Sequence, residues 1–157
     1  VARFRLTCAR AVVVGVERVQ NLAQWEMYRA RRAAMGGGGR ERTLFHGTHP
    51  GAVDSIVSKS FNRSYCGRNG TAFGQGVYFA RDASYSAQAT YASPDAVRVQ
   101  SMFVVRVMVG RVARGAQGMV APPEGYDTTG DNEDNPGIIV VYHDAQAYPA
   151  YLIRFRA

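Results

Sequence analysis

Cysteine is scarce in this chain of 157 residues, and the spacing of its cysteines excludes two classes of protein. The two cysteines, Cys8 and Cys66, lie far apart and form no CxxC pair, which excludes a thiolate zinc site and a disulfide framework. The three histidines lack the HExxH spacing of a zinc protease. We therefore expect no metal and a reducing, intracellular location in the cytoplasm or the nucleus.

Long apolar runs are also missing. No segment approaches the roughly 20 apolar residues of a membrane-spanning helix, and residues 1–20 lack a signal-peptide pattern, so we expect no membrane partner. The length suits one domain with one core, which we place at residues 1–157. Because the chain begins with Val1 and not with Met, we expect this domain to be the C-terminal fragment of a longer protein.

Acidic residues are outnumbered by basic ones, and the formal net charge is +7, mostly from arginine. Such an excess suits an anionic partner, namely phosphate, nucleic acid or an acidic protein surface, or it serves only solubility. For Arg29, Arg31 and Arg32, which share one predicted helix, we favour solubility. No dense basic run interleaved with aromatic residues is present, so a nucleic-acid groove is not signalled, although nucleic acid stays open as a partner.

The spacing of apolar residues predicts several short strands and few helices. Strands are expected at residues 11–19, 43–46, 77–80, 102–109, 138–142 and 151–155. Because these strands do not alternate regularly with helices, we predict an α+β fold that is mainly antiparallel. Residues 61–76 are expected to form a long functional loop, and residues 122–136 an irregular one.

Three helices are expected between these strands. Asn21 is placed to cap the first, whose Trp25 is expected to join the core and which should stop before the glycines at 36–39. The second follows Pro50, with an apolar face of Val53, Ile56 and Val57. The third is expected to start at an Asp82 cap and to run towards Tyr91.

Residues that could bind a ligand or take part in catalysis lie in three segments, at 44–48, 73–80 and 138–142. Each segment alone also suits a purely structural role. Gly47 and Gly76 would let a flat ligand approach the backbone, and His46 offers a donor and an acceptor beside them. Aromatic faces and a hydroxyl are available from Tyr78, Tyr85, Tyr91 and Ser86. Such a cleft suits a flat aromatic amide. The GxSxG and GxGxxG motifs of hydrolases and Rossmann dehydrogenases are absent.

Taken together, these motifs resemble the poly(ADP-ribose) polymerase superfamily. The resemblance rests on His-Gly-Thr at 46–48, Gly-x-Gly-Val-Tyr-Phe-Ala at 74–80, Ser-Tyr-Ser at 84–86 and the closing stretch 141–155. It runs from Val16 to the last strand and is closest to the macrodomain-linked, mono-ADP-ribosylating branch, through residues 61–65 and 146–149. It implies the split-sheet, diphtheria-toxin-like ADP-ribosyltransferase fold, with a few short helices.

The resemblance implies a role for each matching residue around NAD+. His46 would hold the ribose next to nicotinamide, Gly47 and Ser86 would bind the nicotinamide amide, and Tyr78 and Tyr91 would sandwich its ring. The adenosine side would be bound by Thr48 and by a lid loop over residues 62–69, including Asn62 and Tyr65.

One departure from the family bears on the product. Polymer-forming relatives carry a glutamate at the position that corresponds to Ile138. An aliphatic side chain neither accepts a proton nor orients a hydroxyl, so chain elongation is expected to fail. The catalytic set is therefore expected to be His46, Tyr78 and Ile138, with NAD+ as co-substrate. A single ADP-ribose would pass, through an oxocarbenium-like transition state, to a Glu or Asp of an acceptor protein or of the chain itself.

Two alternatives remain at this stage. The chain is either an enzyme or an inactive module of the same fold that binds NAD+ or a protein. As an enzyme, it would modify proteins or, as the excess of arginine allows, the ends of nucleic acids.

Overall fold

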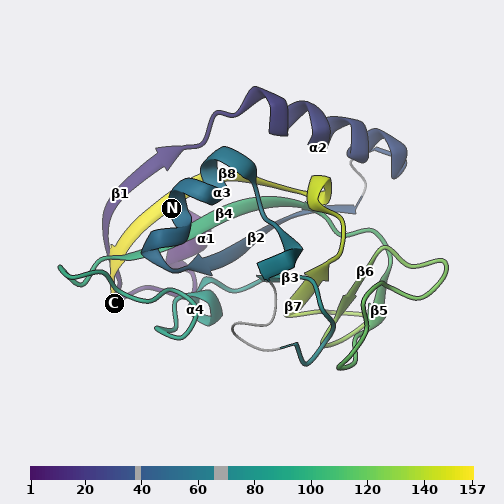
Figure 1. Cartoon of the computed structure of the whole chain (residues 1–157). Helices are drawn as coiled ribbons and strands as arrows, with labels where there is room; N and C mark the ends of the chain where they lie inside the picture. The colour runs from purple at the N-terminus through teal and green to yellow at the C-terminus, as the bar shows by residue number, and fades with distance from the viewer. Residues whose placement is uncertain (38–39, 66–70) are drawn as a thin grey trace.

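The computed structural model describes residues 1–37, 40–65 and 71–157, so Cys66 and residues 66–69 of the expected lid at 62–69 lie outside the described residues. The described strands form one sheet (Figure 1). They are β1 (Val12–Arg18), β2 (Glu41–Thr48), β3 (Val77–Ala80), β4 (Gln100–Met108), β5 (Val112–Arg114), β6 (Thr128–Gly130), β7 (Ile138–Val141) and β8 (Ala147–Arg156).

The sheet has the order β1-β8-β4-β2-β3-β7-β6-β5, and its pairings are antiparallel except that of β5 with β6. The mainly antiparallel α+β fold predicted from the sequence is therefore confirmed. The long strands β1, β8, β4 and β2 make up one half, and the short strands β3, β7, β6 and β5 make up the other. Within the described ranges, a single Cα pair, Phe45 with Ala80, joins β2 to β3 and thus the two halves.

Four α-helices occur in the described ranges: α1 (Ala2–Arg5), α2 (Leu22–Ala34), α3 (Val53–Lys59) and α4 (Ala83–Ser86). Short 3₁₀ turns are η2 (Pro50–Ala52), η3 (Arg63–Tyr65) and η4 (Asp144–Gln146). Helix α2 lies along one side of the sheet and α4 lies near the opposite side, while both chain termini lie at the same end (Figure 1). The predicted cap of α2 is confirmed, because the Asn21 Oδ1 accepts from the Gln24 N–H at 3.2 Å.

Alternation along β4 separates the apolar core into two layers. Phe103, Val105 and Val107 pack with α3, which buries Val53 and Ile56 as predicted. The intervening Met102 and Val104 face a second cluster, which contains α1 and α4 residues. Neighbouring residues of β2 contact different layers: Phe45 belongs to the second cluster, whereas the ring of His46 packs against Phe61 of the first.

A third cluster lies under α2 and includes Tyr28, Met108 and Tyr148, with Trp25 packed against it. The Tyr28 hydroxyl donates to Glu41 at 2.8 Å, and the guanidinium of Arg106 lies 5.1 Å from the centre of the Trp25 ring. Trp25 is therefore partly buried core, as the helix spacing predicted, and α2 is fixed to β2 and β4 by both polar and aromatic contacts.

The prediction that residues 122–136 are irregular is wrong in part, because β6 lies within them. This strand is only three residues long, which is too short for alternation to reveal. Side chains fix it: the Thr128 hydroxyl donates to the Val109 carbonyl at 2.8 Å, and the Thr129 hydroxyl donates to the Phe73 carbonyl at 2.7 Å. Helix α1 and strand β5 were also missed, for the same reason of length.

Candidate active site

His46 lies in β2, one residue after the pair that joins the two halves of the sheet. Its Nδ1 is 2.8 Å from the Tyr78 carbonyl oxygen in β3, so the imidazole bridges the junction. Because a carbonyl only accepts, Nδ1 must carry the proton, and Nε2 is left as an acceptor. The ring packs edge-on against Phe61, with centroids 5.0 Å apart. Burial lowers the pKa of His46 below its ordinary value, against the opposing effect of the bond to Tyr78, so the ring is neutral at pH 7.

Gly47 is enclosed by the chain segment that follows α4. A Cβ at this position would overlap the Ser86 carbonyl oxygen and would lie 3.1 Å from the Ala92 N–H nitrogen. A Cβ at Gly76 would overlap the backbone of Val141 in the same way. Close packing of the backbone therefore requires glycine at both positions, and the approach of a flat ligand to their backbone groups stays a prediction.

Ser86 is the last residue of α4 and is 4% exposed. Its hydroxyl donates to the Phe45 carbonyl at 3.2 Å, which brings it to the residue before His46. The structure therefore brings Ser86, His46 and Gly47 together at the junction of the two halves, as the resemblance implied. The serine hydroxyl retains its lone pairs as acceptors in addition to this donated bond.

The expected helix from Asp82 to Tyr91 is shorter than predicted, and its cap is different. Helix α4 ends at Ser86, and the Asp82 side chain makes no capping bond. Its carboxylate is engaged by the Arg81 guanidinium at 3.0 Å, and the Thr7 hydroxyl instead accepts from the Ser84 N–H at 3.1 Å. Thr7 lies far away in the sequence, so no local pattern reveals this cap.

The segment after α4 brings Tyr85 and Tyr91 together. Their rings stack with centroids 5.0 Å apart at 20°, and their hydroxyls are 2.8 Å apart. The buried Gln100 of β4 fixes the backbone on both sides of Tyr91, because its Nε2 donates to the Ala87 carbonyl at 2.8 Å and to the Ala92 carbonyl at 2.6 Å. Tyr91, predicted to stack on nicotinamide, is therefore already held in a defined place.

Tyr78 uses its hydroxyl to hold a turn. The Phe73 N–H donates to this hydroxyl at 2.9 Å, and the hydroxyl donates to the Gly74 carbonyl at 2.8 Å. Gly74 has φ +128°, and a Cβ there would overlap the Tyr142 hydroxyl. The Gly-x-Gly motif thus forms a tight turn against two tyrosines. The backbone carbonyl of Tyr78 contacts the ring of His46.

The residues expected on the adenosine side lie at the far end of β2 and in the loop after α3. Thr48 is buried at the end of β2, where it pairs with Ser101. Asn62 is exposed, its Oδ1 accepts from the Ser64 N–H at 2.8 Å, and Tyr65 ends η3. Arg63, which the sequence reading did not single out, donates to the Tyr142 carbonyl at 3.1 Å and so ties this loop to the end of β7.

Ile138 begins β7 and pairs with Ala80, so it lies directly across from the end of β3. Its side chain is 6% exposed and belongs to the apolar core. The Asp131 carboxylate, also missed from the sequence, accepts from the N–H groups of Gly137 and Ile138, both at 2.9 Å. The carboxylate fixes the backbone at the start of β7, and the side chain at position 138 is purely apolar.

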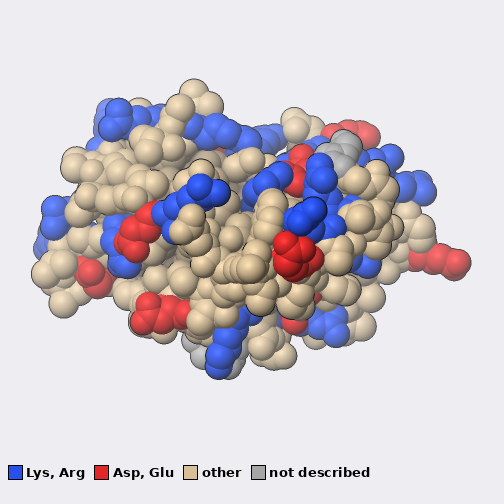
Figure 2. Space-filling view, turned by 90° about the horizontal axis from the view of Figure 1, so that it is seen from above, with Lys and Arg blue, Asp and Glu red and all other residues tan. Residues whose placement is uncertain are grey.

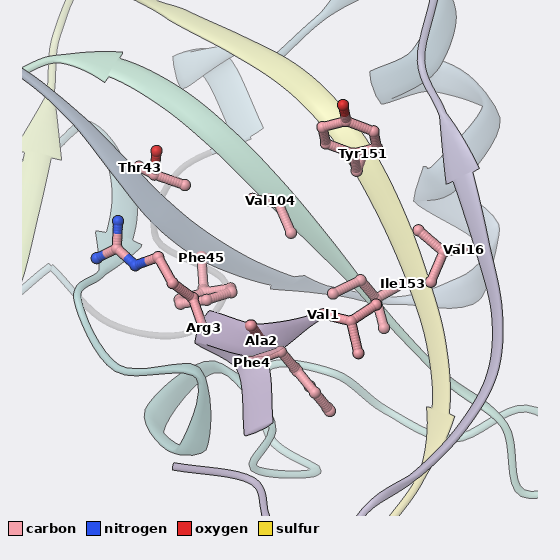
Figure 3. Close-up of a pocket in the computed structure, with 10 residues that line it drawn as sticks. All are labelled: Val1, Ala2, Arg3, Phe4, Val16, Thr43, Phe45, Val104, Tyr151 and Ile153. Atoms are coloured by element: carbon pink, nitrogen blue, oxygen red, sulfur yellow. The ribbon is translucent and has the colours of Figure 1, made fainter. Parts of the chain in front are cut away.

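A cavity of about 350 Å³ lies away from these residues (Figure 3). Figure 3 shows α1 on one side of it and the side chains of Val16, Val104 and Tyr151 on the neighbouring strands. Phe45 lines it, whereas His46, the next residue of β2, packs against Phe61 in the other core layer. None of the site residues predicted from the sequence lines this cavity.

Basic and acidic side chains are interspersed on the face seen from above in Figure 2. Several arginines are paired: Glu41 binds both Arg32 and Arg106, and Glu17 binds Arg154. In the described part of the chain, no group of three or more His, Cys, Asp or Glu side chains is arranged to hold a metal ion. No helix within residues 1–37, 40–65 and 71–157 has the length and apolar character needed to cross a membrane.

Comparison with known proteins gives consistent matches. The family described as the poly(ADP-ribose) polymerase catalytic domain matches residues 5–136, a range that ends just before Ile138. Human protein mono-ADP-ribosyltransferase PARP14 is 40% identical over 99% of this chain and 9% of its own length. Human protein mono-ADP-ribosyltransferase PARP12 is 40% identical over 97% of the chain and 23% of its own length.

Mouse protein mono-ADP-ribosyltransferase PARP10 is 40% identical over 92% of the chain and 16% of its own length. The chain thus spans less than a quarter of the length of each of these three relatives. The matched range of the family includes His46, Tyr78, Ser86 and Tyr91. The chain therefore belongs to the poly(ADP-ribose) polymerase catalytic-domain family.

Proposed function

We propose that this domain is an NAD+-dependent protein mono-ADP-ribosyltransferase, which transfers one ADP-ribose to a Glu or Asp side chain and releases nicotinamide. Membership of the family supports the use of NAD+. The printed names of the relatives describe mono-ADP-ribosylation by those proteins. The observation that carries the proposal for this chain is the buried, aliphatic Ile138 beside the junction that holds His46 and Tyr78.

The junction offers groups that fit the nicotinamide half of NAD+. The neutral His46 has its Nε2 free to accept from a ribose hydroxyl, because the Tyr78 carbonyl fixes the proton on Nδ1. Tyr78 and Tyr91 offer aromatic rings, and Ser86 lies beside Gly47 to bind a carboxamide. These groups are held by backbone and side-chain bonds before any substrate arrives, which lowers the cost of ordering them on binding.

The reaction requires little from position 138. The bond between the ribose C1′ and the nicotinamide nitrogen breaks, and nicotinamide leaves with the electron pair. A carboxylate oxygen of the acceptor then forms the new bond to C1′. Because a carboxylate is already anionic near pH 7, it needs no base to activate it. A sugar hydroxyl does need one, and Ile138 does not provide it, so elongation stops after one transfer.

The test incubates the domain with labelled NAD+ and an acceptor protein, measures nicotinamide release, and separates the products by size. We expect release and one discrete shift, no release from His46→Ala, and no change for the control His49→Ala, since the exposed His49 only caps η2. Smears or ladders of product would contradict single transfer. No release from the unaltered domain would indicate a binding module, and label on RNA or DNA that is added in place of the acceptor protein would indicate a nucleic-acid acceptor.

A further inference from the structure

Tyr85 lies beside the proposed nicotinamide site, and the proposed function does not use it. It is the third residue of α4 and is 39% exposed, yet it makes two contacts with Tyr91. Its ring stacks on that of Tyr91, with centroids 5.0 Å apart at 20°. Its hydroxyl lies 2.8 Å from the Tyr91 hydroxyl. A partly exposed tyrosine with both contacts to one neighbour is held in a single orientation relative to it.

We propose that Tyr85 is a positioning residue, which fixes the ring of Tyr91 as a ready-made platform for nicotinamide. This inference rests on the proposed function, because it takes Tyr91 to be the residue on which nicotinamide stacks. Tyr85 acts through Tyr91 and does not itself contact the reacting atoms. It therefore controls the affinity of the nicotinamide half of NAD+ and leaves the adenosine half unaffected.

The backbone and the ring of Tyr91 are held by different partners. Gln100 is 4% exposed and bonds to the carbonyls of Ala87 and Ala92, so it fixes the turn on which Tyr91 lies. The Tyr91 N–H also donates to the Gln88 carbonyl at 2.9 Å. None of these bonds restricts the rotation of the Tyr91 side chain. The stack and the hydroxyl pair with Tyr85 restrict it, so removing Tyr85 frees the ring without freeing the backbone.

The hydroxyl pair is stable at the pH of an assay. Burial first, and then the bond to Tyr91, raise the pKa of Tyr85 to about 12. The Tyr85 phenol therefore keeps its proton near neutral pH, and one hydroxyl of the pair donates to the other. A platform that is already ordered binds a flat ring without the entropy cost of ordering a free tyrosine side chain.

The experiment compares the unaltered domain with Tyr85→Leu, which removes ring and hydroxyl, and Tyr85→Phe, which removes only the hydroxyl. Binding is measured by calorimetry with two probes, nicotinamide and ADP-ribose, and KM and kcat for NAD+ are measured by nicotinamide release. The control is Tyr151→Leu, because Tyr151 is 43% exposed on β8 and faces the separate cavity.

Tyr85→Leu is expected to raise the Kd for nicotinamide and the KM for NAD+ about tenfold, since an aromatic pair and a hydrogen bond are both lost. Tyr85→Phe keeps the stack and is expected to restore most of the affinity, leaving an increase of about threefold. For Tyr85→Leu, the Kd for ADP-ribose is expected to stay unchanged and kcat to change less than KM. Tyr151→Leu is expected to match the unaltered domain in every measurement.

Two results would overturn the inference. Unchanged nicotinamide binding in Tyr85→Leu would show that Tyr91 is positioned without it, and equal weakening of ADP-ribose would show a general loss of structure. If the unaltered domain binds neither NAD+ nor nicotinamide, both the proposed function and this inference are wrong. If it binds both and Tyr85→Leu binds them equally well, this inference alone falls.

Discussion

The two halves of the sheet are built on different principles. The half made of β1, β8, β4 and β2 has strands of seven to ten residues, and side chains of β2, β4 and β8 fill the core layers. The half made of β3, β7, β6 and β5 has strands of three or four residues, and its turns are held by hydroxyls such as those of Tyr78 and Thr129. The long half provides most of the ordered strand length, and the proposed chemistry lies where the polar, short half meets it.

The largest loss of unfolding free energy is expected from a substitution in the long half. Phe103 is fully buried in β4 and packs within the main core. Phe103→Ala is expected to lower the free energy of unfolding by about 3–5 kcal/mol, since it removes apolar contacts and leaves a cavity. Denaturant unfolding measures this, with Leu22→Ala as the control, because Leu22 is 73% exposed. A loss of stability no greater than that of the control would mean that the long half does not dominate stability.

The next largest loss of unfolding free energy is expected from a substitution at the junction. Gly47→Ala places a Cβ against the Ser86 carbonyl, and we expect a loss of about 1–3 kcal/mol in unfolding free energy together with loss of nicotinamide release. Gly15→Ala is the matched control, because nothing lies within 4 Å of a Cβ there. An active Gly47→Ala domain would show that the packing of α4 on β2 is not needed for the site.

A smaller effect is expected in the short half. The Tyr142 hydroxyl is 2.7 Å from the Thr129 hydroxyl and 3.3 Å from the Phe73 carbonyl oxygen, and its one proton is shared between these two acceptors. Tyr142→Phe removes both contacts, and we expect a loss of about 1 kcal/mol, because Thr129 still donates to Phe73. Hydrogen exchange should quicken around residues 73–76 and leave β4 unchanged. Equal quickening in β4 would show that the two halves open as one unit.

The smallest effect on stability is expected from the protonation of His46 at the junction. Burial lowers the pKa of His46 in the folded protein, whereas the unfolded chain protonates this residue near the ordinary value of about 6.5. The unfolded state then binds more protons as the pH falls below that value, so stability is full above it and declines towards the folded pKa. Denaturant unfolding at several pH values, compared with His46→Gln, isolates this contribution. An identical pH profile in the variant would contradict it.

How far the sequence predicts the fold differs between the halves. The long strands β4 and β8 carry enough alternating residues to be recognised, and the Val-rich stretch that becomes β1 stands out by composition. Strands β5 and β6 are three residues long; the carbonyls of Phe73 and Val109 hold β6 in place, and β5 pairs with β6. Such contacts leave no local pattern, so these strands were missed.

The candidate site shows the same limit. His46, Gly47 and Ser86 were predicted from motifs, and the structure places them together. Two residues that fix the backbone around the candidate site were not predicted: Gln100 holds the turn after α4, and Asp131 holds the backbone at Ile138. Their side chains act on backbone groups brought near by the fold, and only three-dimensional packing identifies those groups.

The bond between the Ser84 N–H and the Thr7 hydroxyl bears on how this domain can be shortened. A fragment that starts at β1 would keep every strand of the sheet and would still satisfy a strand-based definition of the domain. It would lose Phe4, whose ring packs on Phe155 at 5.1 Å, and the cap of the helix that carries Tyr85 and Ser86. We therefore expect the first seven residues to be part of the smallest unit that keeps the candidate site intact.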